Sequence, residues 1–419
     1  MTHLQTMTVG ELIDSTLETA FGYVRSARAC PELEDRELVR LGLCRVLTTH
    51  QSGREWLQAC RDRGQKEIPR STFFDAMRSP RRAQMVTETC EAWARVAGRL
   101  MSQAGVDWLA HFPELKGCEV LAADGHVIEH ACHAETDSKG RRVPVGIVYA
   151  MDLRNGLSVP VAPVSGDGRR QHELPVLRRA IRKAGAQPGR IYVLDRAYHD
   201  KQFWSRMVGE KGFVMITRSK KGMRPVHRIP MPFDKHDPIN TGVTGYDLVG
   251  LEGALGSMYE VTYTNPENGE QFSFLTTGRF PRPGLIAWLY FLRWKIEKMY
   301  DTFKNRFRET KAWANGAAAA EAQSSFLCMT YNLLRLLEAL LKDQYGLRDE
   351  KVERKYTAWL ERRAQVARKK GGSLTPLLSM PRMPQLSAQF IRAVRNYLYV
   401  PSTIGALLAV FTAAFQGYL

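Results

Sequence analysis

Four polar residues near the middle of the chain have types and spacings that could act on a phosphodiester. Tyr290, Arg293, Glu297 and Lys304 fall at about 0°, −60°, −20° and −40° on a helical wheel, so in one helix they would share a narrow stripe. Apolar residues gather on a separate face suited to core packing: Leu289, Leu292, Ile296, Met299, Phe303 and Phe307. The carboxylate of the stripe could hold a metal ion while the two cations and the phenol grip phosphate oxygens.

Two aspartates stand directly after predicted strands. The apolar run at 119–123 predicts a strand that delivers Asp124 at its end, and the run at 190–194 predicts another that ends at Asp195. If these strands are neighbours in a mixed sheet, both acids emerge at one edge and could share a metal site. Aspartates at strand ends often only cap turns. The pair therefore carries weight only together with Glu297 and its stripe.

The elements around these acids follow a β-β-β-α-β-α-β order. After the first strand come a hairpin over 142–151 and 157–164, a helix from 172, the strand at 190–194, a helix over 201–208 and a strand over 212–217. Residues 219–282 are rich in Pro, Gly and Asp and predict a β-rich insertion with one clear hairpin, 257–264 and 271–277.

Helical patterns dominate both ends of the chain. We predict a helical N-terminal region over 1–112, a catalytic α/β domain over 113–340 interrupted by the 219–282 insertion, and a helical C-terminal region over 341–419. Within the first, 53–63 and a second helix capped by Ser71 or Thr72 could form a helix-turn-helix that reads DNA ends, or belong to a plain helical bundle. The alanine-rich 315–322 segment is expected to be a linker before a helix over 326–342.

Composition favours a polyanionic partner. The 419 residues carry 60 Lys and Arg against 43 Asp and Glu, a net charge of +17. Neither a signal peptide nor a membrane span is expected, and the apolar run from Ile404 to Phe415 is interpreted as a buried terminal helix. Seven scattered cysteines fit reduced thiols in a cytosol. The basic run from Arg362 to Lys370 is either a solvated helix face or a contact with flanking duplex.

The spacing Tyr-x2-Arg-x3-Glu-x6-Lys resembles the YREK signature of the DDE transposases of bacterial insertion sequences, of the insertion-sequence-four type. The resemblance covers about residues 115 to 335. It implies a ribonuclease-H-like catalytic core and a catalytic, metal-binding triad of Asp124, Asp195 and Glu297. It also implies DNA contacts by Tyr290, Arg293, Lys304 and Arg218, the last at the end of the run Phe213 to Arg218.

The same resemblance implies how such a protein works. Two Mg²⁺ ions per site, replaceable by Mn²⁺, would serve cleavage at the terminal inverted repeats and joining of the 3′ ends to target DNA, as in cut-and-paste transposition. The partners would be double-stranded DNA and a second copy of the chain, in a bacterial cytoplasm at the nucleoid. Relatives can hold a flipped base against a tryptophan of the insertion. This chain has none there, so Tyr246, Tyr259, Tyr263 or Phe272 would have to stack on such a base.

Two alternatives for the function stay open. The first is a nuclease on the same scaffold that cuts without joining, and the second is a catalytically inactive transposase derivative that regulates by binding DNA. A zinc site at His126, His130 and His133 is disfavoured, because their spacing suits a helix whereas their surroundings predict strand and turn. These histidines are expected to lie at the surface or to face DNA, and Glu129, Glu135 and Asp137 to be solvated loop charges.

Overall fold

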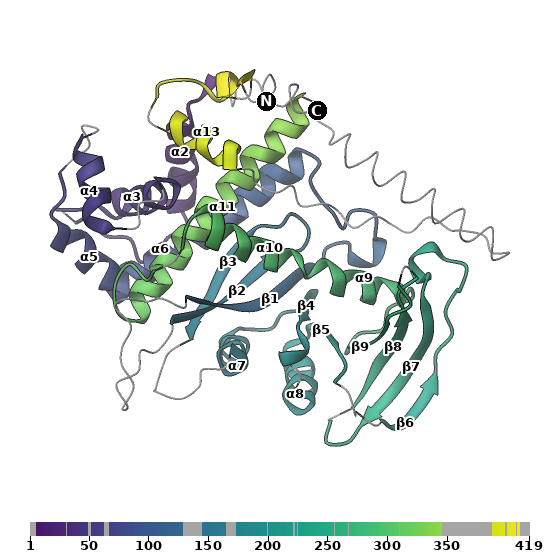
Figure 1. Ribbon diagram of the computed structural model, residues 1–419. Helices are drawn as coiled ribbons and strands as arrows, with labels where there is room; N and C mark the ends of the chain where they lie inside the picture. Colours follow the sequence, from purple (N-terminus) through teal and green to yellow (C-terminus); the bar gives the residue numbers. More distant parts are fainter. Residues whose placement is uncertain are drawn as a thin grey trace.

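A central mixed sheet with helices on both sides organises the molecule (Figure 1). The computed structural model describes residues 6–30, 32–48, 52–62, 67–128, 145–164, 173–198, 200–220, 223, 225–254, 256–266, 268–309, 311–345, 388–398, 400–407 and 409–410. The predicted α/β class is confirmed. Within this described part, no helix is both long enough and apolar enough to cross a membrane. His130, His133, Glu129, Glu135, Asp137 and the basic run at 362–370 lie outside it.

Nine strands of the described chain form one sheet in the order β3-β2-β1-β4-β5-β9-β8-β7-β6. Their bounds are β1 Glu119–Ile128, β2 Val145–Asp152, β3 Ser158–Val164, β4 Arg190–Leu194, β5 Val214–Arg218, β6 Pro225–Pro230, β7 Val243–Leu251, β8 Ser257–Thr264 and β9 Gln271–Thr276. The predicted hairpins, β2–β3 and β8–β9, are confirmed as antiparallel pairs. The predicted insertion does not form a separate sheet, because β9 pairs with β5 and so extends the central one.

The parallel strands β1, β4 and β5 are buried on both faces. Along β4, Ile191 and Val193 pack into one apolar cluster and Tyr192 and Leu194 into another. Helices α7 (Glu173–Lys183) and α8 (Lys201–Lys211), which connect the strands, cover the second face. Helix α9 (Gly284–Leu292) covers the first. This alternation explains why β4 has no polar residue between its first residue and Asp195.

Strand β1 is longer than predicted. Its parallel pairing with β4 covers Glu119–Ala123 and stops there, but its antiparallel pairing with β2 continues from Asp124 to Ile128. The predicted strand end at Asp124 is therefore wrong, since only one of the two neighbouring ladders ends at that point. The consequence for Asp124 is small, because on the β4 side it still lies one residue beyond the last paired position.

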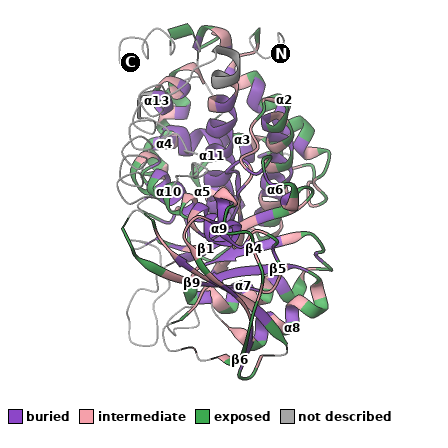
Figure 2. Cartoon of the chain, turned by 90° about the vertical axis from the view of Figure 1, so that its right-hand side faces the viewer, coloured by how far each residue is buried: buried purple, intermediate pink, exposed green. Residues whose placement is uncertain are grey.

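The N-terminal helices pack on a long helix that follows the sheet. They are α2 Val9–Phe21, α3 Asp35–Thr48, α4 Gly53–Asp62, α5 Arg70–Arg78 and α6 Pro80–Gln103, and the long helix is α11 Ala317–Tyr345. A shorter helix, α13 Ala388–Tyr397, contacts α3. One apolar cluster joins α2, α3, α6, α11 and the inner side chains of β2, and Figure 2 shows α11 as a buried rod within it. The Asn332 side chain ties α11 to the sheet through bonds of 2.9 and 2.8 Å to the Ser158 backbone.

Two details of the predicted helices are wrong. Helix α5 begins at Arg70 directly after Pro69, whose carbonyl accepts from the Phe73 N–H, so neither Ser71 nor Thr72 caps it. From Ala317 on, the alanine-rich stretch is not a linker but the start of α11, as the high helix propensity of alanine favours. Of the apolar C-terminal run, Ile404 and Leu407 are buried in the same cluster as α11.

Gly42 allows α3 to approach α11 closely. A Cβ atom at this position would lie 2.4 Å from the ring of Phe326, which is itself fully buried. Gly42→Ala is therefore expected to lower the free energy of unfolding by about 2 kcal/mol. In the matched variant Gly98→Ala on α6, the new Cβ meets its nearest atom at 3.5 Å. That variant should be neutral, or more stable by up to about 1 kcal/mol. Urea unfolding of both tests this, and equal changes would contradict it.

Candidate active site

Asp124 and Asp195 lie side by side where the parallel ladder of β1 and β4 ends. The last paired positions are Ala123 and Leu194, and each aspartate is the next residue of its chain. The short helix Arg196–Tyr198 turns the chain away after Asp195. This edge of the sheet is therefore shared by two carboxylates from distant parts of the sequence.

The stripe residues lie on three consecutive helical segments rather than on one helix. After α9 the chain makes a tight turn at Arg293–Trp294, with bonds of 3.2 Å from Trp294 N to Phe291 O and 3.0 Å from Ile296 N to Arg293 O. Helix α10 (Lys295–Asp301) follows, and then a π-helical segment, Thr302–Arg306. The prediction of a single regular helix is thus wrong.

The break has a packing cause. Side chains of α9 enter the cluster under β1, β4 and β5, whereas Ile296, Met299 and Phe303 enter the cluster around α11. One continuous apolar pattern thus serves two cores, and the regular helical hydrogen bonding is interrupted between them. The π segment opens the helix further, with a 3.0 Å bond from Phe307 N to Thr302 O. Such segments recur at functional sites.

The guanidinium of Arg293 stands among three carboxylates. Its Nη1 lies 3.1 Å from Asp124 Oδ2, and its Nη2 lies 3.6 Å from Asp195 Oδ1 and 3.5 Å from Glu297 Oε1. The Arg293 side chain is 4% exposed, whereas those of Asp124, Asp195 and Glu297 are 20, 37 and 45% exposed. The acids are therefore partly exposed to solvent, whereas the arginine between them is buried.

The two aspartates differ in pKa. Burial raises the pKa of Asp124 to about 6, although the Arg293 charge and the Gly125 N–H oppose the shift. Burial acts in the same direction on Asp195. There the Arg293 charge, the N–H groups of Arg196 and Ala197 and the Tyr290 hydroxyl outweigh it, so the pKa of Asp195 is lowered. The site thus combines a fully ionised acid with one that binds a proton in mildly acidic solution.

Tyr290 supports Asp195 directly. Its hydroxyl donates a 3.1 Å hydrogen bond to Asp195 Oδ1, and its ring is buried against Phe274. Burial and the Asp195 charge raise the pKa of Tyr290 to about 12, so it remains a donor at neutral pH. Its hydroxyl fixes the orientation of the Asp195 carboxylate.

The other two predicted contact residues lie further from the carboxylates. Arg218 ends β5, where its guanidinium stacks 4.6 Å from the Phe272 ring centre and lies 4.0 Å from Glu270. Lys304 is exposed on the π segment and makes no ion pair within the described chain. Tyr290, Arg293 and Glu297 thus join the two aspartates, whereas Lys304 does not reach them.

Three residues near the site were not predicted. The Tyr300 hydroxyl donates 2.8 Å to the Asp124 carbonyl, and the Tyr198 hydroxyl donates 3.1 Å to Glu173 Oε2. Glu173 fills the space left by Gly125, where a Cβ would lie 2.0 Å from its Cδ. Its negative charge contributes to the raised pKa of Asp124. Nothing in their spacing marks these residues, because the fold alone brings them to Asp124.

His126 was expected at the surface or facing DNA, but it is buried. It is 5% exposed, stacks on Tyr300 at 4.8 Å and lies 3.3 Å from Glu309. Of the stacking residues considered in the insertion, Tyr246 and Tyr263 are buried, whereas Tyr259 and Phe272 are half-buried. The first two present no open face for a base.

The carboxylates fit a hard divalent cation in their chemistry. As the side chains stand, no three His, Cys, Asp or Glu residues of the described chain are arranged to hold one ion, because Arg293 lies between the acids. Yet the donor set is all oxygen, which suits Mg²⁺ or Mn²⁺. Asp124 keeps its raised pKa beside Arg293. One guanidinium faces three carboxylates, so part of their negative charge stays uncompensated.

Comparison with known proteins agrees with this arrangement. A search of curated proteins finds no match for the chain. Residues 116–333, however, match the family described as transposase DDE domain. That segment contains the sheet, both aspartates, Arg293 and Glu297, and its mixed sheet flanked by helices is consistent with a ribonuclease-H-like core. With more than half of its length matched, the chain belongs to the DDE transposase family.

Proposed function

We propose that the protein is a DNA transposase that binds the terminal inverted repeats of its insertion sequence, cleaves there and joins the 3′ ends to target DNA. The observation that supports this most is the convergence of Asp124, Asp195 and Glu297 on Arg293. Members of the family generally use divalent metal ions. Here the three carboxylates would hold them, in a Mg²⁺ or Mn²⁺ pair. When bound, such ions activate a water or a 3′-hydroxyl and stabilise the leaving oxygen.

The protein's own residues would orient the reacting groups. Tyr290 fixes the Asp195 carboxylate, and Arg293 limits the repulsion between three negative charges. Arg218 and Lys304, both with cationic groups near or at the surface, would contact DNA phosphates, and Tyr290 and Arg293 would help to position the strand ends. We also propose, from the YREK spacing, that the protein is a transposase of the insertion-sequence-four type.

The helical parts are proposed to handle DNA and assembly. Residues 1–112 would bind the element ends, through α4 and α5 either as a helix-turn-helix or as part of a bundle, and 341–419 would contact DNA or the second copy. Paired joining requires two ends held together, so the working form would be a dimer on two DNA ends. The site of action would be the bacterial nucleoid.

A joining assay tests the proposal. The DNA that flanks the gene should contain short inverted repeats bracketed by a direct duplication, and these repeats supply the substrate. Purified protein, pre-cut repeat ends, target plasmid and Mg²⁺ should yield joined products, and EDTA should prevent them. Cleavage without joining would instead identify a nuclease. DNA binding without any metal-dependent chemistry would identify a regulator.

Metal affinity is expected to depend on pH through Asp124. Because its pKa is about 6, below that pH the carboxyl group is protonated and a proton must leave before a cation binds. The apparent affinity for Mn²⁺ should therefore rise about tenfold per pH unit up to about pH 6 and level off above it. Titration calorimetry in buffers of different ionisation heat should detect about one proton released at pH 5.5 and none at pH 7.5. Proton release that is unchanged in Asp124→Asn would contradict this assignment.

A further inference from the structure

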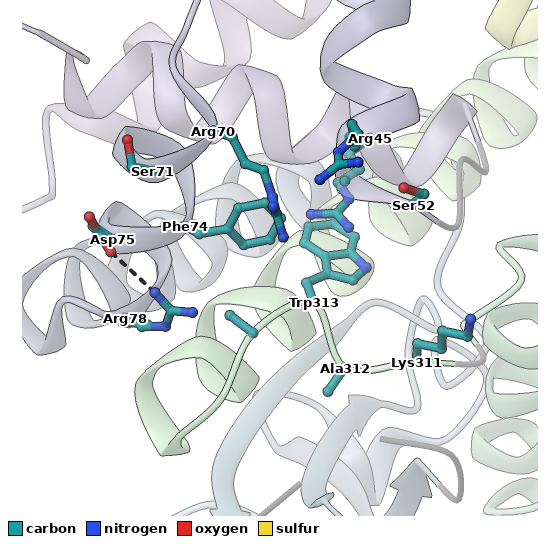
Figure 3. A pocket seen from close by; sticks show the side chains of 13 residues that line it. Arg45, Ser52, Arg70, Ser71, Phe74, Asp75, Arg78, Lys311, Ala312 and Trp313 are labelled. Carbon is teal, nitrogen blue, oxygen red and sulfur yellow. Dashed lines mark hydrogen bonds and ion pairs between the residues drawn. The ribbon is translucent and has the colours of Figure 1, made fainter. Parts of the chain in front are cut away.

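A cavity of about 690 Å³ opens among the N-terminal helices, away from the elements that carry the three acids. It is lined by the end of α3, the starts of α4 and α5, and the segment at 311–314 that leads into α11 (Figure 3). Arg45 of α3 forms its inner wall and is 2% exposed. A side chain of this charge is rarely buried so completely without a partner.

Aromatic rings hold the Arg45 guanidinium in place. It lies 4.0 Å from the ring centre of Trp313 and between 5.6 and 5.8 Å from those of Trp56, Phe73 and Phe74. The Trp313 indole in turn stacks on Phe326. Figure 3 shows Arg45 above Trp313, with Phe74 and Arg70 beside the same opening. Cation–π contacts of this kind orient a guanidinium but leave the N–H groups at its edge without acceptors.

No such acceptor is found in the described chain. The Nε and Nη1 atoms of Arg45 are buried and have no hydrogen-bond partner there, and no described carboxylate forms an ion pair with Arg45. Burial lowers the pKa of Arg45 to about 9, so the side chain remains charged at neutral pH. A buried charge without a counter-ion is strongly unfavourable, and an anion that entered the cavity would relieve it.

The rim of the cavity adds further positive charge. Arg54, Arg70 and Lys311 line it and are exposed, and none of them pairs with a carboxylate of the described chain. Asp75, the acid in the lining, is 3.1 Å from Arg78 and is thereby neutralised. Four cations thus face one opening with no anion of the described chain to balance them.

We propose that this cavity binds a backbone phosphate of DNA, whose charge balances the buried Arg45 guanidinium in the cavity wall, with Arg54, Arg70 and Lys311 contacting neighbouring phosphates. The inference rests on the proposed function, since it places a second DNA contact outside the catalytic core. A phosphate is favoured over a base because both faces of Trp313 are already engaged, by Arg45 and by Phe326. A fork of N–H donors also matches phosphate oxygens in shape.

DNA binding by full-length Arg45→Met tests this. Anisotropy of a labelled duplex carrying the terminal repeat should be followed in EDTA between about 0.05 and 0.3 M salt. Loss of one phosphate contact should reduce the slope of log affinity against log salt by about 0.9. It should also weaken binding about tenfold at fixed salt. Arg45→Lys should keep the slope, because it keeps the charge, but weaken binding because it lacks the planar fork. An unchanged slope and affinity in Arg45→Met would overturn the assignment to DNA.

Arg335→Met is the matched control. Arg335 is also buried and stacks on a tryptophan, Trp108, but it pairs with Glu338. Its replacement should leave the salt slope unchanged. A slope reduced equally in both variants would mean that general disturbance of the fold, and not a lost phosphate contact, explains the result.

Thermal unfolding tests phosphate binding in the cavity independently of the proposed function. Sodium phosphate, compared with sodium chloride at equal ionic strength, should raise the melting temperature of the wild type more than that of Arg45→Met, because the general stabilising effect of phosphate acts on both proteins. Equal stabilisation of both proteins would overturn the cavity as a phosphate site. If phosphate stabilises the wild type more than the variant while the salt slopes agree, the cavity takes a free phosphate and the DNA proposal fails. If the wild type binds no repeat duplex at all, the proposed function fails, and the phosphate comparison still tests the cavity.

Discussion

Glu297→Ala is expected to abolish cleavage and joining without unfolding the protein. Glu297 provides one of the three carboxylates that converge on Arg293, and it is the most exposed of them. Under the proposed function, its loss would leave two carboxylates to hold the divalent ions and remove charge stabilisation from the reaction. The rate should fall by about 10³-fold or more. Because the side chain is about half exposed, its truncation should change the melting temperature little.

The measurement is joining of pre-cut ends by wild type and variant at equal concentration, with circular dichroism to check folding. Glu210→Gln is a suitable control, since it removes an exposed carboxylate from α8. The control should retain full activity. Activity in Glu297→Ala within tenfold of wild type would remove Glu297 from the site.

Arg293→Met is expected to destabilise the protein in a metal-dependent way. Arg293 is almost fully buried and is the cation closest to the three acids, so its loss leaves their negative charges facing one another. Breaking a buried ion pair on one side costs about 3 kcal/mol or more. In EDTA the melting temperature should fall markedly, and Mg²⁺ or Mn²⁺ should restore part of it, because a bound cation neutralises the same carboxylates. Joining should be lost.

Arg190→Met provides the comparison. Arg190 pairs with Glu119 at the other end of the β1–β4 ladder, where both side chains are partly exposed. Such a pair contributes about 1 kcal/mol or less, and metal should have no effect on that variant. If Arg293→Met melts like the wild type in EDTA, the guanidinium does not stabilise the acidic cluster, and its role as counter-ion is wrong.

Parts of the site could be predicted because they depend on local pattern. A strand buried on both faces is uniformly apolar, so the first acid after it stands out, and Asp195 was found in this way. The adjacency of β1 and β4, which brings Asp124 to Asp195, was an expectation of the fold class, and the structure has it.

Other parts depend on packing that no short pattern records. The break at Arg293 arises because α9 and α10 enter different cores, while their apolar spacing is continuous. His126 was expected at the surface or facing DNA, but its strand continues along β2 and buries it against Tyr300. No sequence pattern marks Arg45, because the rings around it come from α4, α5 and the segment before α11.

The position of α11 limits how such proteins can evolve. This helix lies at the end of the matched catalytic segment, yet its buried side chains also pack against α3 and α6. In a chimera that exchanged residues 1–112 between two related elements, the side chains of the new N-terminal helices would have to pack against an unchanged α11. If residues 1–112 bind the element ends as proposed, new end specificities should arise by substitutions on the outer faces of the N-terminal helices, rather than by exchange of that whole region.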